Sequence, residues 1–511
     1  MLSRPKRPVT ESNVPAIDLK ATLLPSSQRS AALPWARKDT IAISALTLIA
    51  LLTRFWRLGY PPVMIFDEDL VVPWARCYLR GLPYANHHPP LPPLLIALSI
   101  LAFGDKPWAW RVPSAILGVS LVAVTYLLGR RMLNSRLVGA IAAALIVGSG
   151  LFLVHSRIGI HEIFYLTFAA CSYLMLFRFA ADPSPPSQRQ ILVWMGIALG
   201  LCAASKLLIP AATELLVLSF LVLLTVHSAH RDGLDVRAGL AAPLRRQVGG
   251  SLALVGGLSA LVYLTVFAPN YWFGWWRGIG DQLSYYHWIL RTDTGLGPHG
   301  HPNDSPWWSW PLMLRPILYW ENKSFFVRPD LPIAAIKAMD NPAICWAALA
   351  AIPVVTMQAI AGKNTPRAFL AIGFALYLAM WIPITRFTFL YHYMPALYLG
   401  FLALAVVLAE CWRGRSRMWE EALLLASLIP SLVLGLGTRA GLVTGTAIGA
   451  SWLVLARSGQ GKSGKFVCIL LGFAVIALFG YFFPVWFGLP ISQAEMLART
   501  WLRGPGLANW Y

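Results

Sequence analysis

The chain has 511 residues, of which 57% are hydrophobic and only 13% are charged, with a mean hydropathy of +0.60. Soluble globular proteins carry about 25% charged residues, so this composition excludes an ordinary soluble enzyme. The formal charge of +20 would suggest a nucleic-acid partner in a soluble protein. Here the basic residues concentrate in short connectors between apolar runs, which is a topology signal, and we expect no nucleic-acid partner.

Thirteen apolar runs approach the roughly 20 residues that a helix needs to cross a bilayer. We expect spanning helices at about 40–57, 110–129, 137–154, 163–180, 191–208, 209–226, 250–268, 343–360, 368–385, 389–409, 421–437, 440–456 and 466–484. The run at 91–103 is too short to cross alone and predicts a re-entrant or interfacial helix. The predicted fold class is all-α, a polytopic transmembrane helical bundle of about 11–13 spans with two long external loops.

The charges between these runs predict the orientation of the chain. Basic residues collect in alternate connectors, as at Arg413, Arg415 and Arg417, whereas most acidic residues fall in the others. The positive-inside rule then places the N-terminus in the cytoplasm. We expect the protein to lie in the cell (inner or plasma) membrane. The predicted parts are a disordered cytoplasmic arm (1–38), an N-terminal membrane module (39–268) with an external loop at about 58–109, an aromatic external loop (269–340), C-terminal transmembrane helices (341–484) and an external tail (485–511).

The second external loop is rich in tryptophan, and its role stays open between two interpretations. Trp residues gather at membrane interfaces, so an aromatic belt accounts for most of them. Interleaved polar groups such as Tyr285-Tyr286-His287 and His299-Gly300-His301 would also suit a sugar or lipid. The tryptophans concerned are Trp272, Trp275, Trp276, Trp288, Trp307, Trp308, Trp310 and Trp320.

The first external loop holds the side chains best suited to chemistry. Asp67, Glu68 and Asp69 are adjacent carboxylates that repel one another at a membrane surface, unless a cation or a substrate compensates. The alternative is a solvated acidic turn. His87 and His88 precede two prolines that favour the start of a helix. These histidines are candidates for a site, or else a loop pair or an interfacial anchor.

Further ionisable residues lie at the outer ends of the expected spans. Taken singly, each is explained by snorkelling to the headgroups. Taken together, carboxylates for general-base catalysis beside several cations suit a lipid-phosphate donor at the outer interface. These residues are Arg54, Arg111, His155, Arg157, His161, Glu162, Lys206, Arg386 and His392. The six cysteines are scattered and show neither a disulfide framework nor zinc-site spacing.

Seven short segments then occur in a familiar order. They are Phe66-Asp67-Glu68, His88-Pro89-Pro90-Leu91, Trp110 to Gly118, Ser156-Arg157 with Glu162, Ala204-Ser205-Lys206, Ser305 to Pro311, and Phe389 to Ala396. In this order they resemble the protein O-mannosyltransferases (dolichyl- or polyprenyl-phosphate-mannose–protein mannosyltransferases) of the glycosyltransferase C superfamily. The likeness runs from about residue 40 to 511, and the tail Phe483-Pro484-Val485-Trp486 is similar to the end of bacterial members.

The chain departs from the family pattern in three places. Glu162 stands where the family usually has Asp. Pro92-Pro93 follows the His-Pro-Pro-Leu motif in place of a common Gly-Lys, which removes one possible phosphate-binding lysine. The loop at 269–340 is too short for the large domain that eukaryotic members insert, so the resemblance points to a bacterial-type enzyme.

The resemblance implies a metal-independent, cofactor-independent, inverting transfer of mannose from polyprenyl-phosphate mannose to a Ser or Thr hydroxyl. The implied partners are the lipid-linked donor, a Ser/Thr-containing protein acceptor and membrane lipid, with the protein-export machinery as a further candidate. An alcohol needs a carboxylate base, and a departing phosphate needs preorganised cations. Asp67 is the implied base, and Glu68 orients the acceptor or sugar or raises the pKa of Asp67. The implied substrate-binding residues are Arg54 and Arg111 (phosphate), Lys206 and Arg386 (further cations), Glu162 (acceptor) and His88 (donor or loop).

Two other functions remain open from the sequence. A transferase of the same type could act on a glycolipid acceptor with the same carboxylates. A lipid-linked-sugar transporter or flippase would explain the spans and outer cations, but not the ordered motifs. An inactive membrane scaffold gives no reason for three carboxylates beside two histidines.

Overall fold

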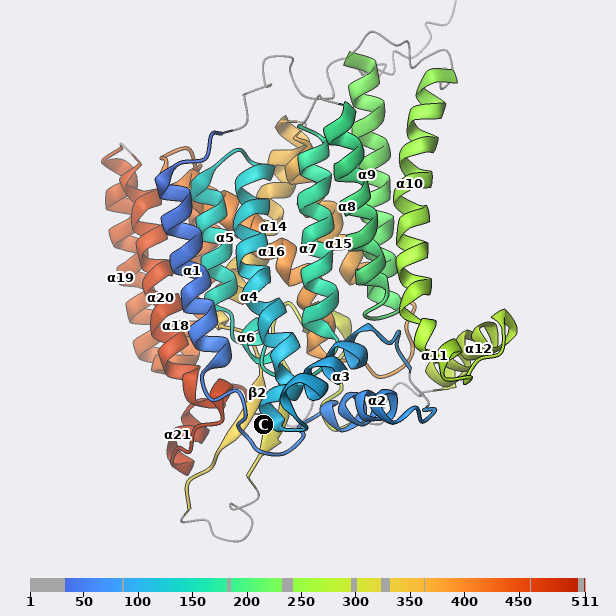
Figure 1. The fold of residues 1–511 in the computed structure, drawn as a ribbon. Coiled ribbons are helices and arrows are strands. Elements are labelled where there is room, and N and C mark those ends of the chain that lie inside the picture. The colour runs from blue at the N-terminus through green and yellow to red at the C-terminus, as the bar shows by residue number, and fades with distance from the viewer. Residues whose placement is uncertain are drawn as a thin grey trace, which may run out of the picture.

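The computed structural model describes residues 33–84, 87–181, 185–231, 242–295, 301–322, 331–362, 364–459, 461–503 and 510. Most of the predicted cytoplasmic arm (1–38) and the pair His299-Gly300 lie outside these residues. Figure 1 shows long, roughly parallel helices, with several short elements gathered at one end of the bundle. That end is called the site end below.

The long helices follow the predicted runs closely. Those before the second loop are α1 (Arg37–Phe55), α4 (Pro107–Met132), α5 (Arg136–Gly148), α6 (Gly150–His155), α7 (Glu162–Phe179), α8 (Pro185–Ala203), α9 (Leu208–Arg231) and α10 (Ala242–Val266). Those after it are α14 (Pro342–Gly362), α15 (Thr365–Ala379), α16 (Met394–Trp412), α17 (Met418–Ala426), α18 (Ile429–Leu436), α19 (Thr438–Arg457) and α20 (Lys462–Phe487). Within the described residues, nine helical stretches are long and apolar enough to cross a membrane. The prediction of a polytopic helical membrane protein is confirmed.

Two predicted single helices are each divided in two. The run at 137–154 breaks at Ser149, whose hydroxyl accepts a hydrogen bond from Phe152 N and so caps α6, while it donates to Asp340 Oδ1. The run at 421–437 is divided between α17 and α18 at 427–428.

The short elements lie at the site end (Figure 1). They are α2 (Glu68–Arg80), α3 (Leu91–Phe103), α11 (Ala268–Trp272), α12 (Ile279–Gly295), η3 (Trp307–Ser309), β1 (Ile317–Glu321), β2 (Ala335–Ala338), η4 (Leu390–Tyr393) and α21 (Gln493–Ala498). The run at 91–103 forms a short helix that packs against α2 and α4, and its re-entrant or interfacial position stays a prediction.

The second loop is more ordered than an all-α fold implies. Strands β1 and β2 pair antiparallel, with Ile317 opposite Ala338 and Glu321 opposite Ala335. Ile333 forms a bridge with Ile491 in the predicted external tail. The tail is therefore joined by backbone hydrogen bonds to the loop that precedes α14.

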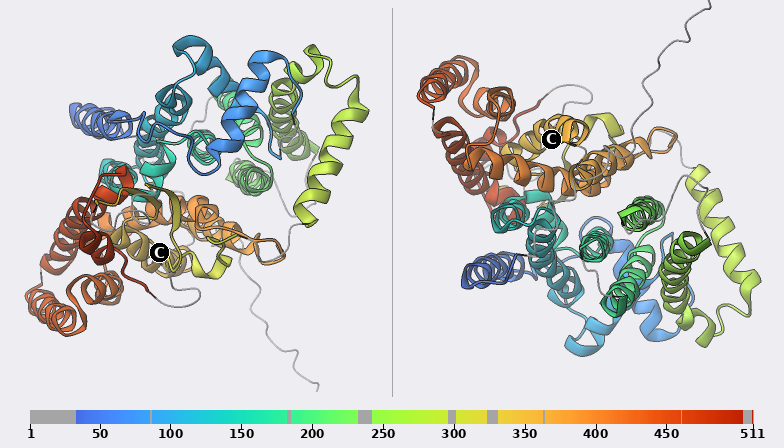
Figure 2. Two further views of the ribbon diagram at one scale, coloured as in Figure 1. Left: turned by 90° about the horizontal axis from the view of Figure 1, so that it is seen from below. Right: turned by 90° about the horizontal axis from the view of Figure 1, so that it is seen from above.

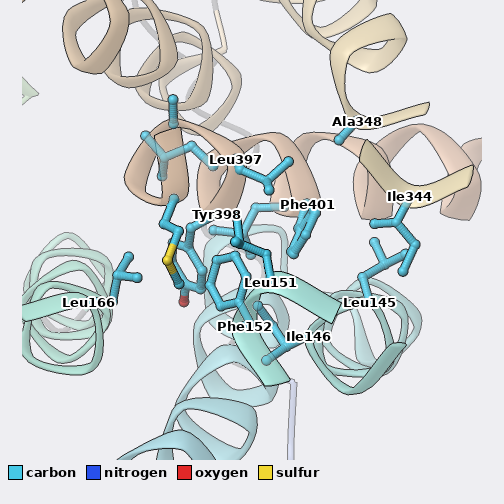
Figure 3. Close-up of a cluster of buried hydrophobic side chains, with 14 of the residues drawn as sticks. Leu145, Ile146, Leu151, Phe152, Leu166, Ile344, Ala348, Leu397, Tyr398 and Phe401 are labelled. Carbon is cyan, nitrogen blue, oxygen red and sulfur yellow. The ribbon is translucent and has the colours of Figure 1, made fainter. Parts of the chain in front are cut away.

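Helix α16 forms the centre of the core. Its side chains are almost all buried, whereas α10 and α19 lie at opposite edges of the bundle (Figures 1 and 2). Figure 3 shows Phe152 of α6 against Phe401 of α16, whose ring centroids are 5.2 Å apart. Gly150 lets α6 also pack closely on α20, because a Cβ there would meet the Trp486 ring at 2.0 Å. The core thus fixes α6, which leads directly to the site end.

Candidate active site

Glu68 and Arg111 form a buried ion pair beneath the start of α2. Arg111 Nε donates to Glu68 Oε1 and Nη2 donates to Oε2, each at 2.8 Å. Both side chains are inaccessible to solvent. The carboxylate also accepts hydrogen bonds from the backbone N–H groups of Gly159 (2.8 Å) and Ile65 (3.1 Å). This pair joins α2, α4 and the loop before α7.

The structure does not support the predicted phosphate role of Arg111. Its remaining N–H groups donate to the carbonyl oxygens of Leu58 (3.1 Å), Pro61 (3.1 Å) and Val63 (2.9 Å). A guanidinium has five N–H donors, and all five are used within the protein. Arg111 therefore holds the backbone between α1 and α2, and Glu68 is its partner and not an acceptor-orienting group.

Asp67 stands one residue before α2 and its side chain is partly exposed. Phe66, just before it, adopts a left-handed backbone conformation with φ of 47°, which is uncommon for a bulky residue. Its ring stacks on Tyr319 of β1 at 4.2 Å and meets the edge of Tyr391 at 6.1 Å. The second loop and η4 thus hold the backbone that presents Asp67.

Tyr319 is in turn fixed by a buried histidine. His155 Nδ1 lies 2.8 Å from the carbonyl oxygen of Leu151, so this nitrogen carries the proton. His155 Nε2 is then the acceptor for the Tyr319 hydroxyl, also at 2.8 Å. The chain of contacts runs from the core through His155 and Tyr319 to Phe66 and Asp67.

We expect Tyr319 to be a positioning residue. Tyr319→Leu should lower kcat by about 10- to 100-fold, because it removes the ring on which Phe66 stacks and lets the Asp67 carboxylate move. Tyr319→Phe keeps that ring and should retain most of the activity. Steady-state kinetics of both variants measure the difference, and an unchanged kcat in Tyr319→Leu would exclude this role.

The surroundings of Asp67 favour its protonated form. Burial raises the pKa of Asp67 to about 7, and the negative charges of Glu162 and Asp69 add to this effect while Lys206 opposes it. Among the described residues, no hydrogen bond to its carboxylate contributes to this shift. A carboxylate with a pKa near neutral is suited to accept a proton from an alcohol.

Glu162 and Lys206, whose charges both shift the pKa of Asp67, form an ion pair. Lys206 Nζ donates to Glu162 Oε1, and both side chains are nearly buried. The same ammonium lies 4.9 Å from the ring centroid of Tyr391. The N-terminus of α7 positions Glu162, and the turn between α8 and α9 positions Lys206.

His88 and Arg386 complete the group. The His88 ring centroid lies 4.7 Å from that of His161. Burial, together with the nearby charges of His161, Lys206 and Arg386, keeps the pKa of His88 well below its usual value, so the imidazole is neutral. Five of the predicted residues thus gather at the site end: Asp67, His88, Glu162, Lys206 and Arg386.

Arg54 lies elsewhere. Its side chain is fully buried between α1 and α5, where Nη2 donates to the Ile146 carbonyl at 3.0 Å and Nη1 to Thr53 Oγ1 at 3.0 Å. Within the described residues these hydrogen bonds join α1 to α5, and none reaches Asp67, Glu162 or Lys206. The phosphate role of Arg54 therefore stays a prediction from the sequence.

The tryptophans of the second loop do not form one class. Trp272 is 88% exposed, as an interfacial belt requires, but Trp310 is 1% exposed and belongs to the core. Trp275 and Trp276 line a pocket of about 120 Å³ together with Tyr285 and Asn270. The belt interpretation fits only part of the set.

Sequence reasoning missed Tyr319 and Tyr391 as site residues. Tyr391 lay inside a segment that carried the family resemblance, so a signal for it existed. Tyr319 lies in none of the segments that carried the resemblance. Only the pairing of β1 with β2 shows that it lies beside Phe66. Within the described residues, no group of three His, Cys, Asp or Glu side chains could hold a metal ion.

Three family models match the chain. The model described as the C-terminal four-transmembrane region of protein-O-mannosyltransferase matches residues 281–504. Two models described as dolichyl-phosphate-mannose-protein mannosyltransferase match residues 87–235 and 44–110. Together they span most of the chain, from the first long helix to the tail.

Curated relatives match over nearly their full length. A polyprenol-phosphate-mannose–protein mannosyltransferase of Mycolicibacterium smegmatis is 26% identical over 92% of this chain and 93% of that protein. The protein of the same name from Mycobacterium tuberculosis is 25% identical, over 90% of this chain and 91% of its own.

Solved structures share the fold. The Saccharomyces cerevisiae Pmt1-Pmt2 complex bound to the sugar donor matches with a TM-score of 0.71 and 15% identity, over 94% of each chain. ArnT of Cupriavidus metallidurans bound to undecaprenyl phosphate matches with a TM-score of 0.53 and 13% identity, over 90% of this chain and 77% of its own. With the family models and the site described above, these findings show that the chain is a multi-pass membrane glycosyltransferase of the protein O-mannosyltransferase family.

Proposed function

We propose that this protein transfers mannose from polyprenyl-phosphate mannose to Ser or Thr hydroxyls of exported proteins, with inversion at the sugar. The observation that carries this proposal is the Asp67 carboxylate, whose pKa is raised to about 7, opposite the Glu162–Lys206 pair. The mycobacterial relatives bear the name of this activity, and the chain matches them along almost its whole length.

The proposed mechanism uses Asp67 as general base. It accepts the proton of the acceptor hydroxyl as that oxygen attacks the anomeric carbon, and the bond from that carbon to the phosphate oxygen breaks on the opposite face. The leaving phosphate gains negative charge, which Lys206 and Arg386 stabilise as preorganised cations. Glu162 sets the position of Lys206 through their ion pair. Neutral His88 then serves as a hydrogen-bonding group for the donor.

We place the site end outside the membrane and the opposite end in the cytoplasm. The connectors at the opposite end carry basic clusters such as Arg130, Arg131 and Arg136. Such clusters mark cytoplasmic loops. In this orientation an acceptor approaches Asp67 from the aqueous side, and the donor lipid stays in the bilayer. Contact with the protein-export machinery remains a prediction from the sequence.

The raised pKa of Asp67 predicts an acidic limb in the pH profile. Because the base must be ionised, kcat/KM should rise with pH and level off above about 7. Glu162→Gln removes a negative charge that raises this pKa, so the limb should move to lower pH even though activity falls. Donor-saturation kinetics between about pH 5 and pH 9 test both points. A limb near the ordinary pKa of an aspartate would contradict the assignment.

A transfer assay tests the proposed function directly. Purified protein would receive radiolabelled polyprenyl-phosphate mannose with a Ser/Thr-rich peptide and, in parallel, a glycolipid fraction. Label in the peptide that is lost in Asp67→Asn supports the proposal. Label in lipid alone would change the acceptor class and retain the mechanism. Movement of the donor across vesicles without product would favour a transporter instead.

A further inference from the structure

A second feature of the molecule lies away from Asp67, on the membrane-facing side of the bundle. A groove of about 550 Å³ lies between α1 and α20, with α5 and α16 also lining it. Helices α1 and α20 both lie on the side of the bundle where α19 is found (Figure 1). Its lining carries no charged side chain, and Ile476 on its wall is 74% exposed. This groove is called the α1/α20 groove below.

Three cations lie at the end of the α1/α20 groove nearest the site end. Arg57 is exposed, whereas Arg54 and Arg157 are buried. Arg157 donates to the carbonyl oxygens of Arg54 (3.0 Å) and Arg57 (3.4 Å), so the three residues are close neighbours. Burial, together with the charges of Arg111, Arg54 and Arg57, lowers the pKa of Arg157 to about 9. In the part of the chain that the structure describes, none of the three forms an ion pair with a carboxylate.

Among these three arginines, Arg54 is buried with part of its guanidinium unpartnered by any described residue. Its Nε is buried and has no hydrogen-bond partner within the described residues. The guanidinium bonds to Thr53, which lines the α1/α20 groove, and to Ile146, between the lining residues Leu145 and Val147. A buried cation without a counter-ion is costly, so a nearby anion would stabilise the folded protein.

Aromatic rings connect the groove to these cations. Phe479 lines the groove, Phe483 packs against it at 6.0 Å, and Phe487 stacks on Phe483 at 4.2 Å. Trp56 lies 5.2 Å from Phe487, and the Arg157 guanidinium lies 4.4 Å above the same ring. Trp rings lie at the level of lipid headgroups, and basic side chains there attract anionic ones, so this end of the groove suits an anionic headgroup.

The α1/α20 groove is distinct from the proposed donor site. None of the residues gathered around Asp67, such as His88, Glu162 and Lys206, is among those that line the groove. The lining of α20 runs from Cys468 to Phe479, about 18 Å at the rise of an α-helix. This length is close to the depth of one bilayer leaflet, about 15 Å. A groove of this length suits one acyl chain of a membrane phospholipid.

We propose that the α1/α20 groove binds an acyl chain of an anionic phospholipid, whose phosphate contacts Arg57 in the positive field of Arg54 and Arg157. Bilayer phospholipid is the occupant, in preference to the lipid-linked donor, because the groove has the length of one leaflet and lies apart from Asp67.

Native mass spectrometry of the full-length protein tests this site. The protein would be extracted from vesicles of equal phosphatidylglycerol and phosphatidylcholine, and the retained lipid identified. We expect wild-type protein to retain phosphatidylglycerol preferentially. Arg57→Gln should reduce that preference about fivefold, the effect of losing one basic side chain near an anionic headgroup. Arg57→Lys should keep most of it.

Two glycines on α20 give a matched pair for the groove itself. Gly472 lines the groove, and a Cβ there meets no atom within 4 Å, so Gly472→Leu fills the groove without a clash. Gly480 is equally unobstructed but is not among the lining residues. Gly472→Leu should lose the retained lipid, and Gly480→Leu should keep it. Thermal melting checks that both variants are folded.

Four results would overturn the proposal. The first two are equal retention of the two phospholipids by wild-type protein and full retention in Gly472→Leu. The third is displacement by polyprenyl phosphate that excess phosphatidylglycerol does not reverse. The fourth is a dimer that Gly472→Leu dissociates, which would assign the groove to a second copy of the chain. Lipid retention is measured without donor or acceptor, so its outcome does not depend on the transferase activity proposed above.

Discussion

Replacing Asp67 by asparagine is expected to lower transfer by about 100- to 10,000-fold, the usual contribution of a general base. The amide has nearly the same shape as the carboxylate but cannot accept the proton of the acceptor hydroxyl. Donor binding should change little, because Lys206 and Arg386 remain in place. The expected loss is therefore in kcat and not in the KM for the donor.

The same substitution should not weaken the fold. The folded-state pKa of Asp67 is raised to about 7 from an ordinary value of 3.8. The native state therefore binds more protons than the unfolded state between these values, so this group makes stability fall as the pH rises through that window. Asparagine carries no charge at any pH in this range. Asp67→Asn should melt at the same temperature as wild type or higher at pH 8.

Asp69→Asn is the matched control. Asp69 is exposed on the first turn of the same helix, so its loss changes the local charge without removing the base. Transfer, donor KM and melting temperature of both variants would be measured side by side. Turnover retained in Asp67→Asn, or an equal loss in both variants, would remove Asp67 from the role of base.

The sequence predicts the helical bundle well, because each spanning helix needs a long apolar run that is visible without knowledge of its neighbours. The breaks within the predicted helices could not be predicted in this way. The break between α5 and α6 depends on Ser149 reaching Asp340, 191 residues away in the chain. No local pattern reports such a contact. The strands of the second loop are also hidden, since four or five residues carry little periodic signal.

In the candidate site, too, the sequence suggests which residues matter but not what each of them does. Residue type and position suggest Asp67, Glu162 and Lys206 as functional, and the structure brings them together. Glu68 and Arg111 have equally suggestive chemistry, yet they satisfy each other and the surrounding backbone. A buried ion pair and a substrate clamp use the same residue types, so only tertiary contacts can tell them apart.

Arg111 provides the second prediction with a large effect. Arg111→Met leaves the Glu68 carboxylate buried and uncompensated, and removing one partner of such a pair costs about 3–5 kcal/mol. The carbonyls of Leu58, Pro61 and Val63 lose their donors as well. We expect a strong fall in melting temperature and in the yield of folded protein, measured in detergent at neutral pH.

The double variant Glu68→Leu with Arg111→Met distinguishes the two roles of this arginine. If the pair is structural, removing both charges relieves the buried carboxylate, and stability should recover in part above that of Arg111→Met. If Arg111 instead holds the donor phosphate, the single variant should melt like wild type and show a raised donor KM. In that case the double variant would gain no stability over the single one. Because Arg111 has no free donor in the structure, we expect the recovery.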